Sequence, residues 1–156
     1  MRRHRSLSPR RHDPDHSLVH WPLTWHGEDP LGYQIHSRGP LAIVVIDGEL
    51  DIATAPDLGE RLEPLVGTGR HLLLDLTGLR FCDAAGLRLF LRLHKQATAA
   101  GGSLHLAAPG RPVSRVISLA RLSDVVPVSA SVAEAIATPA EVAESERPPL
   151  SEVLAR

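Results

Sequence analysis

Apolar residues form two nearly continuous runs in the middle of the chain. The run Leu41–Ile46 is uninterrupted, and the run Leu72–Leu76 is broken only by Asp75. Short apolar runs of this kind are typical of strands that are buried on both faces of a sheet. We therefore expect these two segments to form adjacent central strands.

The segment between the two runs has the spacing of a helix. Leu58, Leu62 and Leu65 lie at positions i, i+4 and i+7, so they form one apolar stripe. Thr54 is the expected N-cap of this helix, and Asp57, three residues later, approximates a capping box. The pattern thus predicts a helix that packs on the sheet through a single face.

A second helix is expected after the run at 72–76, separated from it by a polar turn. Asp83 is the expected N-cap, because its carboxylate can accept a backbone N–H from Gly86 or its neighbour. The helix is too apolar for a one-sided surface helix, and we expect large buried fractions for Leu87, Phe90, Leu91 and Leu93. The loop 81–86 would then lie beyond the carboxyl end of a strand, where α/β proteins place their sites.

Weaker patterns complete the alternation of strands and helices. Alternating residues predict an edge strand at 33–36 and another strand at 103–107. A third helix is expected from the stripe of Val113, Val116, Ile117 and Ala120, followed by a short edge strand of Val125, Val126 and Val128. Ser131 and Glu134 predict a capping box for a last helix.

The resulting order, β-β-α-β-α-β-α-β-α, spans residues 32–138. It predicts an α/β fold with a small, mixed, mostly parallel sheet flanked by about four helices. Residues 1–31 are basic and rich in His, and residues 139–156 are rich in Pro, Glu and Ser. Neither segment has an apolar period, so we expect two disordered tails around one domain.

The N-terminal segment raises two further possibilities, a metal site and a nucleic-acid arm. His12, His16 and His20 would align on a helix, but Pro14 and Pro22 oppose that helix, so no metal is expected. The five arginines of this segment could contact phosphates, but neighbouring aspartates oppose them. A net charge of −1 gives no general reason to bind nucleic acid or an anionic membrane.

Composition restricts the remaining possibilities. The 156 residues are 43% hydrophobic and 22% charged, as in an ordinary globular protein. No apolar stretch approaches the roughly 18 residues that a membrane-spanning helix needs. Cys82 is the single cysteine, so it cannot form an intrachain disulfide, which fits a reducing compartment and an expected cytoplasmic location.

Signatures of catalysis are missing from the sequence. It contains no Gly-rich phosphate loop with a lysine, no GxSxG motif and no HExxH motif, so we expect neither an enzyme nor a cofactor. Cys82 could be a nucleophile near a helix N-terminus, but an inert, buried or half-buried thiol is the stronger interpretation. His94 and His105 lie among apolar residues and are expected to be core or surface histidines.

Two blocks carry a resemblance to a known family. They are Gly48-Glu49-Leu50-Asp51 and Asp83-Ala84-Ala85-Gly86-Leu87. Together with the residues around them, they resemble the STAS domain, and within that family the bacterial anti-sigma-factor antagonists, over the whole expected domain. The resemblance implies a protein that captures an anti-sigma factor, itself an ATP-binding serine kinase, and so releases a sigma factor. It implies partner binding at Asp51, Asp83, Ala84, Ala85, Gly86 and Leu87.

The sequence departs from this family at the regulatory position. In the family, a serine before the glycine of the second block is phosphorylated by the partner; here that position is Ala85, preceded by Ala84. A phosphate would add about −1.5 to −2 charges to a contact surface and disrupt it. Without a hydroxyl that off-state is unavailable here, which leaves constitutive activity, regulation through another residue, or a different partner open.

The resemblance therefore predicts an anti-sigma-factor antagonist that regulates transcription by partner switching. It leaves a weak homodimer open and implies no direct contact with nucleic acid or membrane. The alternative is a STAS module that serves as a non-phosphorylated scaffold or as a small-ligand-binding regulatory module. Co-purification separates the two, because only the first predicts an ATPase-like anti-sigma partner.

Overall fold

The computed structural model describes residues 30–137. The expected tails therefore lie outside the described residues, except that Leu31 is already the first residue of a strand. The histidines considered as metal ligands also lie outside the described residues.

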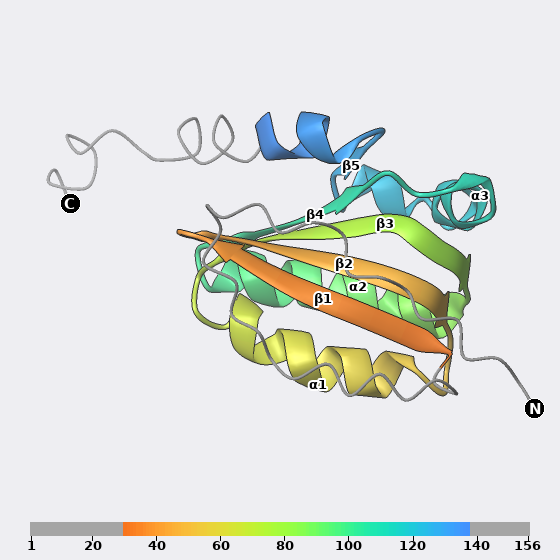
Figure 1. The fold of residues 1–156 in the computed structure, drawn as a ribbon, viewed down its shortest axis with the longest axis horizontal. Coiled ribbons are helices and arrows are strands. Elements are labelled where there is room, and N and C mark those ends of the chain that lie inside the picture. Colours follow the sequence, from red (N-terminus) through yellow and green to blue (C-terminus); the bar gives the residue numbers. More distant parts are fainter. Residues whose placement is uncertain (1–29, 138–156) are drawn as a thin grey trace, which may run out of the picture.

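Five strands form a single sheet in the order β1-β2-β3-β4-β5 (Figure 1). Their bounds are Leu31–Arg38, Leu41–Leu50, His71–Cys82, Ser103–Ala107 and Val128–Ser129, respectively. Strands β1 and β2 are antiparallel, and the other three pairings are parallel. The mixed, mostly parallel sheet is confirmed, and so is the pairing of the two apolar runs in β2 and β3.

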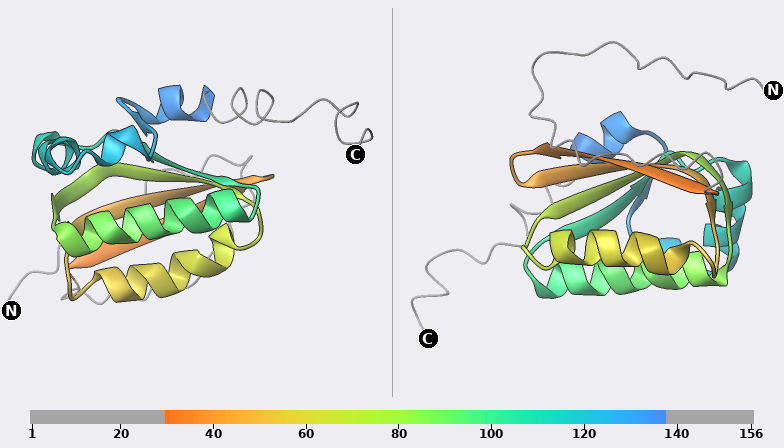
Figure 2. Two further views of the ribbon diagram at one scale, coloured as in Figure 1. Left: turned by 180° about the vertical axis from the view of Figure 1, so that it is seen from behind. Right: turned by 60° about the horizontal axis from the view of Figure 1, so that its bottom comes forward.

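The helices occupy both faces and one end of the sheet. Helices α1 (Ala55–Val66) and α2 (Ala84–Ala99) lie side by side on one face (Figure 2). Residues 132–137 are helical and lie on the opposite face. Helix α3 (Arg111–Leu119) packs against β3 and lies beside the carboxyl end of that strand (Figure 1). The expected set of about four helices is thereby confirmed.

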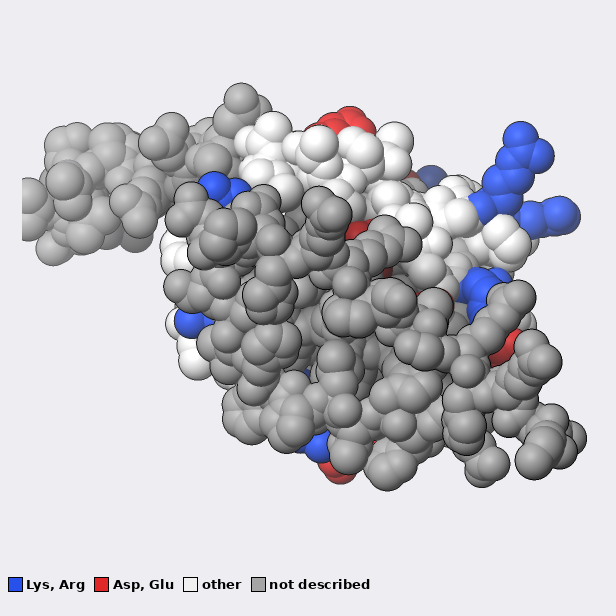
Figure 3. All heavy atoms as spheres, in the orientation of Figure 1, with Lys and Arg blue, Asp and Glu red and all other residues white. Residues whose placement is uncertain are grey.

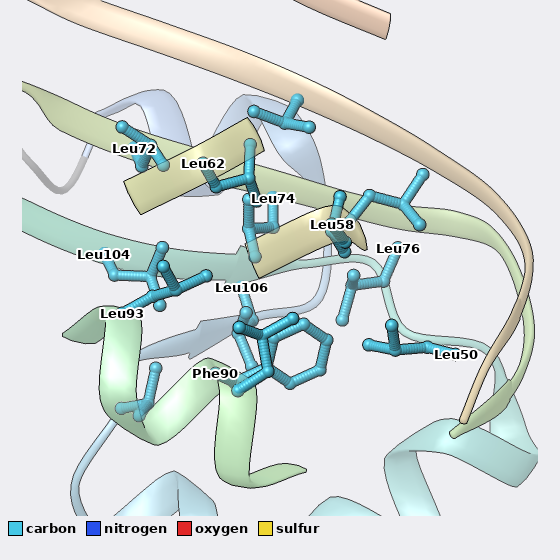
Figure 4. Packing of buried hydrophobic residues seen from close by; sticks show 14 of the residues in the cluster. Leu50, Leu58, Leu62, Leu72, Leu74, Leu76, Phe90, Leu93, Leu104 and Leu106 are labelled. Atoms are coloured by element: carbon cyan, nitrogen blue, oxygen red, sulfur yellow. The ribbon is translucent and has the colours of Figure 1, made fainter. Parts of the chain in front are cut away.

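The core lies between the sheet and the α1–α2 layer. Leu72 and Leu74 point from β3 into this layer, where Leu58, Leu62 and Phe90 meet them (Figure 4). All five are fully buried or nearly so, and burying a side chain of this size stabilises a fold by about 1.5–3 kcal/mol. The core is thus built almost entirely from aliphatic side chains.

Alternation along β3 creates a second, smaller cluster on the other face. Leu73 lies between Leu72 and Leu74 in sequence and therefore points away from α1 and α2. It packs with Ala107 of β4 and with Ala135 of the helical residues 132–137. The apolar run of β3 is thus buried on both faces, as its pattern predicted.

Strand β3 is much longer than the run at 72–76, so the expected polar turn after Leu76 is wrong. Its pairing with β2 shifts twice, between Val45 and Asp47 and between Gly48 and Glu49. Asp75 accepts hydrogen bonds from the backbone and the hydroxyl of Thr77 (3.0 and 2.6 Å), which holds the first irregular segment locally. The polar residues after Leu76 therefore lie at bulges within a strand that continues to Cys82.

Helix α2 is one-sided, contrary to the expectation from its apolar content. Phe90 and Leu93 are fully buried, and Leu87 and Leu91 are partly buried and packed against the core, so the expected burial of these four residues is confirmed. The opposite side of the helix carries exposed cations, Arg88, Arg92 and Lys95. The excess of apolar residues is thus accommodated along the two borders of the buried stripe.

Gly86 allows the first turn of α2 to approach the sheet closely. A β-carbon at this position would lie 2.6 Å from the Cys82 sulfur and 2.9 Å from Cγ of Leu50. Both distances are shorter than real contacts of a β-carbon, so neither neighbour leaves room for a side chain. This glycine fixes how near the start of α2 lies to the ends of β2 and β3.

The chain after α3 differs in detail from the expectation. The short strand is β5, Val128–Ser129, whereas Val125 follows a 3-10 helix and is exposed. Pro127 contributes its carbonyl to Leu106 (2.9 Å), and because it has no N–H the ladder begins only after it. One half of the capping box expected at Ser131 and Glu134 is present, since the Ser131 hydroxyl accepts the Glu134 N–H (3.1 Å). The Glu134 carboxylate accepts the N–H of Ala130, one residue before the N-cap (3.1 Å).

We predict that Gly86→Ala lowers the free energy of unfolding by about 1–2 kcal/mol. Overpacking typically costs 1–3 kcal/mol, and the gain in helix propensity offsets only part of this cost. Urea unfolding would measure the change. In a double-mutant cycle with Cys82→Ala, the two losses should be less than additive, because the second change removes the sulfur that the new methyl group meets. A Gly86→Ala variant as stable as the parent would contradict this account of the helix position.

Candidate functional site

The Asp83 carboxylate connects the start of α2 to the turn that follows β2. One carboxylate oxygen accepts the backbone N–H groups of Ala85 (2.9 Å) and Gly86 (3.2 Å). The other oxygen accepts the N–H of Ile52, 31 residues earlier in the chain (3.2 Å). The N-cap expected from the sequence is confirmed, and a single side chain also fixes a second loop beside it.

The turn between β2 and α1 is held by its own network. Asp51 accepts the N–H groups of Ala53 (2.9 Å) and Thr54 (3.0 Å), while its own N–H is donated to the Thr54 hydroxyl (2.9 Å). That hydroxyl in turn donates to the carbonyl of Glu49 (2.9 Å). The turn is therefore held by hydrogen bonds among its own residues.

The capping box expected at Thr54 and Asp57 is wrong. Thr54 is the N-cap residue of α1, but its side chain makes no hydrogen bond to the start of the helix. Its hydroxyl is buried in the turn, where Glu49 and Asp51 already use it. The sequence pattern failed here because the same hydroxyl had a closer set of backbone partners.

The structure places the six residues of the expected binding site in one region. Asp51, Asp83, Ala85 and Leu87 are partly exposed, and Ala84 is exposed. Gly86 is buried, so its place in the motif is explained by packing and not by surface contact. The five surface positions surround the joint between the β2–α1 turn and the first turn of α2.

Ile52 is a surface residue of this region that sequence reasoning missed. Its side chain is 76% exposed, although it is large and apolar. It lies between Asp51 and Ala53 at the tip of the turn, and its N–H is the group that Asp83 holds. The sequence signal for Ile52 was a large apolar residue inside a polar turn, because the side chain of such a residue cannot reach the core and stays on the surface.

Cys82 lies directly behind the site but is not reactive. The residue is 3% exposed. Burial, and secondarily the nearby Asp83 carboxylate, raises the pKa of the Cys82 thiol to about 12. The thiol is therefore protonated at neutral pH, which opposes the nucleophile interpretation and agrees with an inert, buried cysteine.

A groove of about 480 Å³ lies beside the site, between the end of β3 and α3. It is lined by Phe81, Cys82, Arg111, Pro112, Arg115 and Val116. Phe81 is 48% exposed. The sequence predicts Phe81 in the loop 81–86. The residue instead lies in β3, because this strand continues beyond the expected turn to Cys82.

His105 is the other described residue, besides Cys82, whose pKa is shifted. His105 is buried, and its Nε2 is hydrogen bonded to the Ser129 hydroxyl (2.6 Å). Burial lowers the pKa of His105, while Glu134 opposes this effect, so it is a core histidine, as expected. Within residues 30–137, no group of three His, Cys, Asp or Glu side chains could hold a metal ion. No described helix is long and apolar enough to cross a membrane.

Comparison with known proteins gives one family match and several relatives. The model of the STAS domain matches residues 33–135. The anti-sigma-B factor antagonist of Bacillus subtilis (strain 168) is 34% identical over 87 residues, which cover 56% of this chain and 80% of that protein. The anti-sigma F factor antagonist of Paenibacillus polymyxa is 30% identical over 95 residues, which cover 60% and 80%.

Solved structures share the fold at lower identity. An anti-sigma factor antagonist from Mycobacterium paratuberculosis superposes with a TM-score of 0.65 at 22% identity, over 70% of this chain and 93% of that chain. The anti-sigma factor antagonist SpoIIAA in its unphosphorylated form gives 0.58 at 21% identity, over 67% and 93%. These likenesses show the same arrangement of strands and helices.

We predict a graded response to substitution of Asp83. Asp83→Ala removes all three N–H contacts and should lower the free energy of unfolding by about 1–2 kcal/mol. Asp83→Asn keeps one acceptor oxygen, which can still cap α2, but it loses the bond to Ile52, so it should cost less. Urea unfolding gives the order of stability, and amide hydrogen exchange should show faster exchange at Ile52 in both variants. Unchanged exchange at Ile52 in Asp83→Ala would contradict the connecting role of Asp83.

We also predict that the Cys82 thiol resists alkylation in the folded protein. At pH 8 it should react slowly with iodoacetamide because it is both buried and protonated, and it should react fast in urea. Ser118→Cys in a Cys82→Ser background provides the exposed control, since Ser118 is exposed on α3. Equal rates for Cys82 and the control in the folded state would show that the thiol is accessible.

Proposed function

Because this chain belongs to the STAS domain family, we propose that it is an anti-sigma-factor antagonist that binds an anti-sigma factor and so releases a sigma factor. The protein acts by binding and not by catalysis, as the names of its relatives indicate. An anti-sigma factor works where transcription takes place, so the proposal also implies a cytoplasmic protein.

The observation that carries this proposal is the joint made by Asp83. It holds the β2–α1 turn against the first turn of α2, so that Ile52 of the turn and Ala84 of the helix start are presented side by side. A preformed surface with a protruding apolar side chain can bind a protein with little loss of its own conformational entropy. Asp51, Ala85 and Leu87 complete the proposed contact surface.

We propose that the partner is a serine-kinase-type anti-sigma factor whose phosphorylation site has been lost here. Ala85 is the second residue of α2, and it is half-buried. With a methyl group at this position, the kinase reaction that would switch the contact off has no acceptor hydroxyl. The antagonist would then stay competent for binding, or be controlled through a different residue.

The first experiment identifies the partner. The full chain, tagged and expressed in its native cell, should retain an anti-sigma factor with an ATP-binding kinase domain. Recovery of a bound small molecule, or of a large assembly of this chain alone, would instead support the scaffold or ligand-binding alternative and reject the antagonist proposal.

The second experiment tests the position of Ala85. Ala85→Asp places a permanent negative charge in the contact surface, and a buried unpaired charge at an interface costs on the order of 2–5 kcal/mol. The helix dipole stabilises the same charge in the free protein by roughly 0.3–1 kcal/mol, so folding should survive. We predict that affinity for the recovered partner falls about tenfold or more.

Two variants make this test specific. Ala85→Ser should fold, keep binding, and provide a hydroxyl that a kinase-type partner can phosphorylate. Gln96→Glu adds the same charge at an exposed position near the other end of α2 and should leave the affinity unchanged. Calorimetric titration of all four proteins, with thermal melts, measures the differences. Equal affinity of Ala85→Asp and the parent would place Ala85 outside the contact.

A further inference from the structure

The groove beside α3 combines an exposed aromatic ring with two cations. Phe81 provides one wall, and Arg111 and Arg115 provide the other from successive turns of α3. The two arginines lie at positions i and i+4 and so are on the same side of the helix. The groove is open to solvent along its length, with a volume of about 480 Å³.

The arginines of this groove form no ion pair within the described part of the chain. The two ion pairs found among residues 30–137 join Arg92 to Glu63 and Arg121 to Asp124. Arg111 and Arg115 take part in neither, and both are exposed. On the face shown in Figure 3, cationic side chains protrude at the end of the molecule where α3 lies. The groove therefore offers a positive potential to an approaching molecule.

The groove is continuous with the proposed contact surface. Cys82 lines the groove, and the next residue, Asp83, caps α2. A partner that covers Ala84 and Ala85 would thus have the groove directly at its border. Asp51 in the β2–α1 turn is partly exposed, and Asp57 in the first turn of α1 is exposed. Charges of both signs near the joint can set the orientation of a partner as well as its affinity.

We propose that this groove receives an acidic segment of the anti-sigma partner, with carboxylates on Arg111 and Arg115 and an apolar side chain against Phe81. The inference rests on the proposed function and specifies the chemistry of the partner at one edge of the same surface. Arginine suits this task because its planar group pairs with a carboxylate through two parallel hydrogen bonds and also packs against apolar atoms. The aromatic ring supplies contact area at a small loss of conformational freedom.

Charge reversal tests the inference on the full chain with the recovered partner. The variant Arg111→Glu, Arg115→Glu should bind about tenfold or more weakly at low salt, because it replaces two attractions by two repulsions. The variant Arg61→Glu, Lys95→Glu makes the same change in total charge at exposed positions on α1 and α2, outside the groove. It should bind within about twofold of the parent, since distant surface charges are screened.

Salt dependence and the aromatic wall give independent readouts. Between about 50 and about 300 mM NaCl the parent should lose affinity, and the groove variant should lose much less or even gain. Phe81→Ser should weaken binding at both salt concentrations by a similar factor, because it removes an apolar contact and no charge. Thermal melts of each variant establish that the differences are not caused by unfolding.

A second measurement examines the groove without the partner. The probe is a short blocked peptide of alternating Glu and Leu, added to the full ¹⁵N-labelled chain, and the control peptide has Lys in place of Glu. Only the acidic peptide should shift the amide signals of Phe81, Cys82 and Val116, and the shifts should vanish in the Arg111→Glu, Arg115→Glu variant. Equal shifts from inorganic phosphate at the same concentration would overturn a peptide site in favour of a simple anion site.

The outcomes separate this inference from the function on which it rests. If no anti-sigma factor is retained but the acidic peptide occupies the groove, the proposed function fails and the acidic chemistry of the groove stands. If the anti-sigma factor binds the parent and the groove variant equally well, the inference fails and the proposed function stands. Tighter binding by the groove variant would also overturn the inference, because it would indicate that the groove holds an acidic segment of this chain in competition with the partner.

Discussion

The geometry of the joint between the β2–α1 turn and α2 depends on one carboxylate. Asp83 accepts three backbone N–H groups, two from the start of α2 and one from the β2–α1 turn. Free N–H groups at a helix start and in a turn are costly when they have no partner, so this side chain satisfies both elements together. The β2–α1 turn and the start of α2 are far apart in sequence. Their relative position is therefore determined by three hydrogen bonds to one side chain.

The rest of the fold supplies the rigid base that this carboxylate needs. The parallel pairing of β2 and β3 brings Leu50 and Cys82 opposite each other at the end of the sheet. The Asp83 N–H then donates to the Leu50 carbonyl (3.1 Å), and Gly86 lets α2 descend onto the same two residues. Aliphatic packing beneath α1 and α2 holds this end of the sheet in place, so the surface above it has little freedom to change shape.

Sequence patterns that span a few residues predicted much of this arrangement. Features that depend on contacts between distant segments were not predicted. The buried strands, the four helices and the N-cap at Asp83 follow from patterns that span a few residues, and each was predicted. The contact between Ile52 and Asp83, the length of β3 and the groove beside Phe81 depend on register and bulges between strands. Thr54 shows a similar limit at short range. Its hydroxyl could either cap α1 or bond within the turn, and the sequence pattern predicted only the cap.

The bulges of β3 have a consequence for how the chain tolerates changes in length. Each register shift lets β3 contain one more residue than the stretch of β2 it accompanies. Arg80 is the extra residue of the second shift, and it is exposed together with its neighbour Phe81. Removal of one residue from a bulge can restore the unbroken ladder and leave Phe81 and Cys82 paired with Glu49 and Leu50. Removal of one residue from the buried run before Asp75 would instead shift its register and turn its side chains to the other face. The bulged part of β3 is thus the place where this strand can change its length while its end stays in position.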